Sequence, residues 1–204
     1  MGDKPPTNLK RQILDLKRQV PDLKRLAVVW NRFKRCLEKK RMNEGPKPQI
    51  DEQMIATAYH EAGHAIVAIS LGRTVEKCTI VRNTIRLGAV QLGKGRGQRQ
   101  QDFFEIEAMI LLGGIVSEAK YTGQYNWGGA QQDLRALRRL TLARVNTDQQ
   151  VERLEKRLLD KTAHHLEQPG HWEAVVRVVG ELIKQQAISG RSARHFFDET
   201  MKRF

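Results

Sequence analysis

One predicted apolar helix carries two histidines and a glutamate along its length. Residues 54–71 contain no Lys, Arg or Pro and are rich in Ala and Ile, which predicts a helix buried on most of its circumference. The run HEAGH inside it places His60 and His64 four residues apart, on one face. Burying such groups is costly unless a partner satisfies them. A metal ion is one such partner, and hydrogen bonds within the core are the simpler alternative.

The HExxH spacing predicts zinc chemistry. Two imidazoles stacked one turn apart reach a single zinc ion at about 2.0–2.1 Å. The intervening carboxylate, Glu61, projects beside that face and is placed to take a proton from a zinc-bound water. We therefore expect one zinc per chain, with His60 and His64 as ligands and Glu61 as general base. In the alternative, Glu61 forms an ion pair elsewhere.

A catalytic zinc normally takes three protein ligands, so the third must come from another element. Asp133 is a candidate on local grounds, because it follows a Gly-Gly turn that opens a helix and lies on the apolar stripe of that helix. An exposed aspartate stabilised by a helix N-terminus is the alternative. The other candidates are the downstream carboxylates and four histidines, namely His164, His165, His171 and His195. His164 and His165 are predicted near a helix C-terminus, where the dipole favours their charged form, and no catalytic role is assigned to them.

Three segments occur in an order that resembles a known family. They are AYHEAGHAIV (58–67), LLGGIVSEA (111–119) and GAQQDL (129–134), and together they resemble the peptidase domain of the FtsH-type membrane AAA+ zinc metalloproteases. The resemblance covers about residues 51 to 204. It implies that His60, His64 and Asp133 bind zinc and that Glu61 is the general base.

The sequence also departs from that family. The arginine that follows LLGG in the family is Ile115 here, and its paired glutamates are reduced to Glu118 followed by Ala119. Glu118 is expected either to orient a ligand histidine or to face solvent. No segment matches GxxxxGK[ST], and the glycine-rich run at 93–97 lacks that spacing. No apolar run approaches the roughly 18 residues that span a bilayer. The expectation is a peptidase domain standing without its ATPase motor or membrane anchor.

The predicted fold is α+β and mostly α-helical, with a zincin-like HExxH helix, a small β-hairpin beside the site and a C-terminal helical bundle. Strands are expected at 77–82 and 84–91, and the edge at 85–92 is expected to pair with a substrate backbone. Asp102 and Glu105 are predicted to be the N-cap and N3 residues of a helix ending at Tyr121. Gly113 and Gly114 within it indicate close packing. Further helices are predicted at 129–146, 148–167, 171–187 and 190–203.

Positive charge is concentrated near the N-terminus. Residues 1–50 contain 14 Lys and Arg against 5 Asp and Glu, whereas the remainder contains 22 against 18. We divide the chain into a basic amphipathic helical segment (1–42), a linker (43–50) and the peptidase domain (51–204). The basic segment is expected to pack on the domain or a sister subunit in a homo-oligomer. Alternatives are an anionic membrane surface or a partner ATPase, and nucleic acid is disfavoured because no base-reading motif occurs.

The sequence thus predicts a zinc-dependent metalloendopeptidase that hydrolyses peptides or unfolded protein segments. The alternative is a non-catalytic scaffold or adaptor that assembles with a partner ATPase or protease. Cys36 and Cys78 match no metal-binding spacing, and no signal-peptide core is recognisable, so a cytoplasmic location is expected, with peripheral membrane contact as an option.

Overall fold

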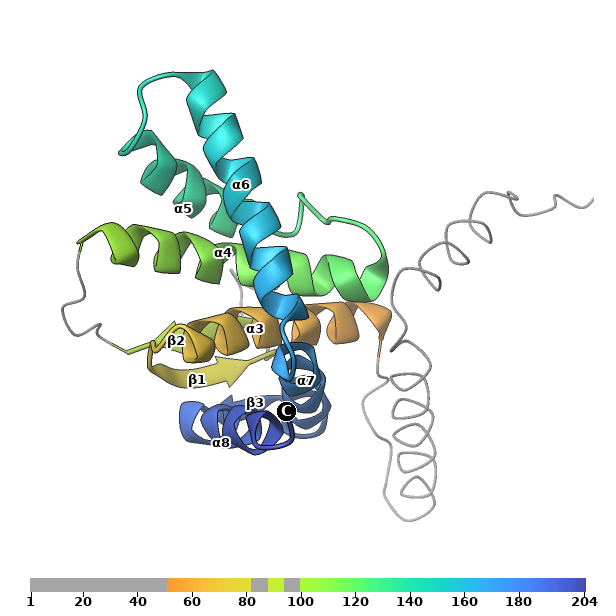
Figure 1. Ribbon diagram of the computed structural model, residues 1–204. Helices are drawn as coiled ribbons and strands as arrows, with labels where there is room; N and C mark the ends of the chain where they lie inside the picture. The colour runs from red at the N-terminus through yellow and green to blue at the C-terminus, as the bar shows by residue number, and fades with distance from the viewer. Residues whose placement is uncertain (1–50, 82–87, 94–99) are drawn as a thin grey trace, which may run out of the picture. The chain divides into compact units, whose positions relative to one another are not determined.

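The computed structural model describes residues 51–81, 88–93 and 100–204. The predicted basic segment, the linker and most of the glycine-rich run at 93–97 lie outside these residues. The described part is mostly α-helical with one small sheet, which confirms the predicted α+β class (Figure 1). Its helices are α3 (Glu52–Ser70), α4 (Gln100–Thr122), α5 (Gln131–Leu142), α6 (Asp148–Glu167), α7 (His171–Gln185) and α8 (Gly190–Met201). Its strands are β1 (Val75–Thr79), β2 (Ala89–Leu92) and β3 (Ala187–Ser189).

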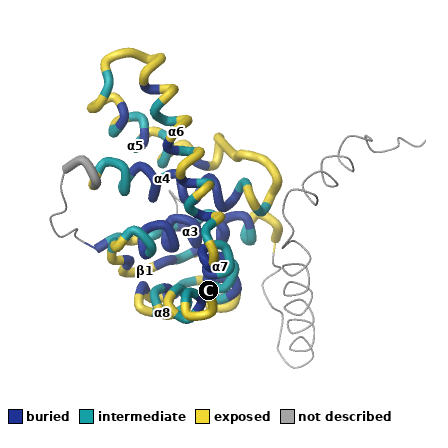
Figure 2. Tube along the Cα trace, viewed as in Figure 1, coloured by how far each residue is buried: buried dark blue, intermediate teal, exposed yellow. Residues whose placement is uncertain are grey.

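Helix α3 is the central element of the described fold. It lies between α4 on one side and the sheet with α7 and α8 on the other (Figure 1). Burial follows this arrangement, since nearly the whole middle of α3 is buried (Figure 2). The helix begins two residues before its predicted start, because the Asp51 side chain accepts a hydrogen bond from the Gln53 backbone N–H at 2.9 Å and caps the N-terminus. The predicted apolar helix around HEAGH is therefore confirmed.

The sheet has three antiparallel strands in the order β2-β1-β3. Antiparallel pairing of β1 with β2 confirms the predicted pairing of the two strands. Both strands are shorter than expected, since Ile80, Val81 and Gly88 are not in strands, and the predicted turn between them lies outside the described part. Strand β3 was not predicted, because three residues are too few to show the two-residue alternation of a strand. It forms where Ile188 pairs with Cys78 of β1. Strand β2 consequently has one edge that pairs with no described strand.

The C-terminal helices divide between two faces of the fold. Helices α5 and α6 pack on α4 around a second apolar cluster, whereas α7 and α8 complete the main core beside α3. Helix α6 has its predicted bounds, while α5, α7 and α8 end earlier than predicted. The end of α7 has a local cause, since Gln186 adopts a left-handed backbone with φ of 61° that cannot continue the helix.

No candidate membrane-spanning helix occurs among the described residues.

The predicted N-terminus of α4 was wrong. The helix already includes Gln100 and Gln101, so Asp102 lies within its first turn and is not the N-cap. Extending an existing helix costs little, and glutamine is a good helix former, so the backbone continues past the expected capping residue. Glu105 forms an ion pair with Lys161 of α6 in place of the expected N3 role.

Two glycines allow α3 and α4 to cross at backbone contact. A Cβ atom added to Gly63 would lie 2.2 Å from the carbonyl oxygen of Gly113, and one added to Gly113 would lie 2.9 Å from that of Gly63. No side chain fits in this space. The close packing predicted for the Gly113-Gly114 pair is therefore confirmed, and Gly63 of the HEAGH run is its counterpart on α3.

We predict that Gly63→Ala destabilises the fold. The added methyl meets a main-chain oxygen rather than a mobile side chain, and such overpacking costs about 1–3 kcal/mol or more. This outweighs the roughly 0.8–1.0 kcal/mol that alanine gains over glycine in a helix. Thermal unfolding should show a lower Tm. Gly128→Ala is the matched control, because its nearest atom would be 3.8 Å away. Equal Tm values for the two variants would contradict the crossing as described.

Candidate metal centre

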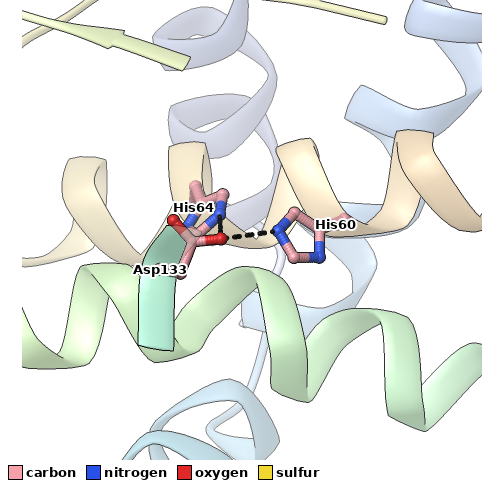
Figure 3. Close-up of side chains that lie close together, drawn as sticks. All are labelled: His60, His64 and Asp133. Atoms are coloured by element: carbon pink, nitrogen blue, oxygen red, sulfur yellow. Dashed lines mark hydrogen bonds and ion pairs between the residues drawn. The ribbon is translucent and has the colours of Figure 1, made fainter. Parts of the chain in front are cut away.

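Three metal-ligand side chains converge from two helices. His60 and His64 come from α3, and Asp133 comes from the first turn of α5 (Figure 3). The Asp133 Oδ2 atom lies 3.1 Å from His60 Nε2 and 3.5 Å from His64 Nε2. The three ligand atoms all lie within 4.8 Å of one another. Asp133 therefore points to the HEAGH face, and the structure brings together the two histidines and the aspartate that the sequence singled out.

Each imidazole is held through its other ring nitrogen. His60 Nδ1 lies 2.8 Å from Glu118 Oε2, and His64 Nδ1 lies 2.6 Å from the carbonyl oxygen of Ile110. An ionised carboxylate and a carbonyl only accept hydrogen bonds, so both Nδ1 atoms donate. Both partners belong to α4, and their bonds direct the two Nε2 atoms toward Asp133. This is the arrangement that fixes the tautomer of metal-binding histidines.

Glu118 is buried in this structure and does not face solvent. Only 6% of it is exposed, and its second oxygen accepts a hydrogen bond from Asn126 Nδ2 at 3.0 Å. Asn126 in turn accepts a bond from the Gly129 N–H at 3.0 Å, which ties the turn before α5 to the site. No sequence pattern distinguishes Asn126 as a site residue, since a lone asparagine in a turn is common.

The pKa values of His60 and Asp133 show that this group of residues favours a positive charge between its members. Burial lowers the pKa of His60, but the hydrogen bonds to Asp133 and Glu118, with the charges of Glu61 and Asp133, outweigh it and raise that pKa to about 9. Burial also raises the pKa of Asp133, yet its hydrogen bonds to His60 and His64 reverse this and leave the pKa well below its usual value. The Asp133 carboxylate is thus ionised, and at neutral pH His60 carries a second proton, on Nε2, in addition to the one on Nδ1. A divalent cation would replace that proton.

Two glycines make room for the site. A Cβ on Gly114 would lie 2.4 Å from His64 Nε2 and 2.8 Å from His60 Cδ2, so any side chain there would displace the imidazoles. A Cβ on Gly88, just before β2, would lie 2.6 Å from Glu61 Oε1. Glu61 is itself 6% exposed. From the sequence, Gly114 is expected only to allow close packing, and no local pattern marks Gly88, because such contacts arise between distant segments.

The site opens into a cleft of about 1110 Å³ formed by α3, β2, α4 and α5. Glu61, His60, His64 and Asp133 all line it. Gly88, Ala89 and Val90 line the same cleft, so one end of edge strand β2 borders the metal centre. A ligand in the cleft therefore has access both to the metal-ligand atoms and to the strand.

The remaining histidines take no part in any metal-ligand group found in the described segments. His165 Nε2 bonds Ser70 Oγ at 2.7 Å, and His171 Nδ1 bonds the His165 carbonyl at 2.7 Å. His164 and His165 lie in the last turn of α6, as predicted, but other effects dominate the pKa of His165. Burial, the neighbouring His171 and other positive charges lower its pKa to about 4, so it is neutral at pH 7. His164 bonds Gln168, and His195 is exposed.

Comparison with known proteins agrees with this geometry. Residues 49–147 match the sequence model of peptidase family M41, a span that includes every residue of the centre. The ATP-dependent zinc metalloprotease FtsH of Caulobacter vibrioides is 40% identical over 119 residues, covering 55% of this chain and 19% of that protein. FtsH 4 of Sorangium cellulosum is 39% identical over 83 residues, covering 38% of this chain and 13% of that protein.

These matches are consistent with an FtsH-type peptidase domain in this region of the chain. The chain spans less than a fifth of the length of these relatives. A third relative, the FtsH of Pelobacter propionicus, is 36% identical over 114 residues and matches 53% of the chain and 18% of that protein. The relatives are zinc metalloproteases by name, and the two imidazoles and one carboxylate described here are the donor types that zinc accepts.

We predict that metal binding at this centre releases a proton at neutral pH. His60 must lose its Nε2 proton before that atom can bind a cation. With a pKa of about 9 for His60, the apparent zinc affinity should rise about tenfold per pH unit from pH 7 and level off above pH 9. Competition with a chromophoric chelator at pH 7, 8 and 9 measures this. An affinity that does not change between pH 7 and 9 would contradict the proton on His60.

Proposed function

We propose that this domain is a zinc metallopeptidase in which His60, His64 and Asp133 bind one zinc ion and Glu61 is the general base. The observation that carries the proposal is the convergence of three ligand atoms within 4.8 Å while both Nδ1 atoms are engaged by α4. Glu118 serves as a positioning residue for His60 through the 2.8 Å bond. Asn126 holds Glu118 in the same way.

The chemistry follows from the residues that surround the cleft. His60, His64 and Asp133 would hold a zinc ion, which would supply a water with a pKa lowered toward about 7 and a Lewis acid for the scissile carbonyl. Glu61, the residue after His60, lines the same cleft and is largely withdrawn from solvent. Its carboxylate accepts the proton from the attacking water and transfers it to the leaving amine. The match to family M41 supports peptide hydrolysis as the reaction.

The substrate binds as an extended segment in this proposal. Strand β2 is at the edge of the sheet and lines the cleft next to Glu61. A peptide that adds to this edge gains main-chain hydrogen bonds, which require an unfolded segment and depend little on its sequence. Peptides and unfolded protein segments are therefore the proposed substrates. The substrates of the relatives are not assigned to this chain, because it matches only part of those proteins.

We predict that Asp133→Asn loses stoichiometric zinc. The amide is nearly isosteric but has no charge, so it is a weaker ligand and no longer stabilises a cation between the imidazoles. Elemental analysis after removal of loosely bound metal should give about one zinc per chain for the wild type and far less for the variant. Asp198→Asn is the control, because Asp198 is exposed on α8. Equal zinc content in wild type and Asp133→Asn would remove Asp133 from the site.

We predict that Glu61→Gln retains zinc and loses peptidase activity. The amide cannot accept the water proton, and removal of a general base lowers the rate by about 10²–10⁴-fold. Cleavage of an intrinsically unfolded protein and of a quenched fluorescent peptide measures the effect. Glu52→Gln is the control, since Glu52 is exposed at the start of the same helix. Wild-type rates in Glu61→Gln would exclude Glu61 as the base, and a zinc-loaded wild type that cleaves nothing would favour the scaffold function.

A further inference from the structure

A set of arginines extends from the metal centre along α5. Arg135, Arg138 and Arg139 follow Asp133 on this helix, and all three line the cleft. The acidic residues that line the cleft are Glu61, Glu118 and Asp133, and each belongs to the metal centre. Within the described residues, the charged lining side chains outside the centre are therefore all positive. This wall of the cleft has an excess of positive charge.

The three arginines differ in the ion pairs and hydrogen bonds that they form. Arg138 forms ion pairs with Asp148 at 2.8 Å and Glu155 at 3.5 Å, both on α6, so its charge is used within the fold. Arg135 makes a hydrogen bond of 3.2 Å to the neutral Gln131 side chain. Neither Arg135 nor Arg139 forms an ion pair within the described part of the chain, and both are exposed. Four residues apart, they share one face of α5.

Their spacing matches an extended peptide at the metal centre. A helix rises 1.5 Å per residue, so Arg135 and Arg139 lie roughly 3 and 9 Å beyond Asp133 along the axis of α5. An extended peptide advances about 3.3 Å per residue. At 3.6 residues per turn, Arg135 and Arg139 do not share the face of α5 that carries Asp133, but both line the same cleft as the metal-ligand residues. Their long side chains are therefore within reach of peptide side chains within about three residues of a bond held at the centre.

We propose that Arg135 and Arg139 select substrates that carry a carboxylate within about three residues of the scissile bond. The inference rests on the proposed peptidase function and names its substrate class, acidic unfolded segments. Guanidinium groups bind carboxylates through paired hydrogen bonds, which strengthens recognition beyond simple charge attraction. Main-chain pairing with β2 would hold the segment, and the arginines would supply the discrimination that main-chain pairing lacks.

The test compares two peptides with both ends blocked. One carries Asp and Glu on either side of the cleaved bond, and the other carries Asn and Gln at the same positions. Zinc-loaded full-length chain should cleave the acidic peptide with a kcat/KM about tenfold higher at low salt, and the ratio should fall toward one at about 1 M salt, where the Debye length is about 3 Å. A neutral peptide with a free C-terminus shows whether a terminal carboxylate substitutes for a side chain.

The double variant Arg135→Gln/Arg139→Gln should lose the preference, so that its ratio of kcat/KM for the acidic peptide to that for the neutral peptide falls toward one. Arg153→Gln/Arg157→Gln is the matched control, with the same spacing and charge change on an exposed face of α6, and it should keep the preference. Equal cleavage of both peptides by the wild type, or a preference that survives in the first double variant, would overturn the inference. Both results leave the peptidase function standing.

Binding separates this inference from the function on which it rests. Fluorescence anisotropy with zinc-loaded Glu61→Gln measures peptide affinity without turnover. Tighter binding of the acidic peptide that depends on Arg135 and Arg139, with no cleavage of either peptide by the wild type, would refute the peptidase proposal and retain the arginine site. A single-stranded oligonucleotide that displaces the acidic peptide at lower concentration than the peptide itself would overturn the substrate class.

Discussion

The close crossing of α3 and α4 is the constraint on which the site depends. Gly63 and Gly113 have no side chains of their own at the contact, so the two backbones approach closely. Only at that separation can the Ile110 carbonyl and the Glu118 carboxylate of α4 reach the Nδ1 atoms of the α3 histidines. Gly114, the next residue along α4, leaves the space that the imidazoles occupy. The same contact thus packs the core and orients the metal-ligand atoms.

The charged residues around this contact change sign with distance from the metal centre. Glu118 accepts from His60 and is itself held by Asn126, so a chain of hydrogen bonds runs from the turn before α5 to the imidazole. Asp133 completes the group from the helix that this turn opens. Beyond the centre the lining charges within the described residues become positive on α5. A negatively charged centre suited to a cation is therefore bordered by a surface suited to an anion.

The sequence predicted those parts of the fold that local patterns encode. The absence of Lys, Arg and Pro around HEAGH indicated a buried helix, and α6 has its predicted bounds because Thr147 and the Pro169-Gly170 pair mark its two ends. The predicted element bounds were wrong where tertiary contacts, or a strand of only a few paired residues, decide the secondary structure. Strand β3 exists only through its bonds to β1, and α4 extends past Asp102. His165 is neutral because burial opposes its charge, a quantity that no sequence pattern reports.

By itself, the sequence determined the chemistry on offer: two histidines one turn apart, a glutamate between them, and an aspartate on the apolar stripe of a later helix. Those facts follow from helical periodicity and residue type. The tertiary structure alone decided that Asp133 meets both imidazoles, that Glu118 is buried against His60 and that Gly88 packs against Glu61. The physical reason is distance along the chain. Asp133 is separated from His60 by 73 residues, and local periodicity cannot say which distant faces a folded core will bring together.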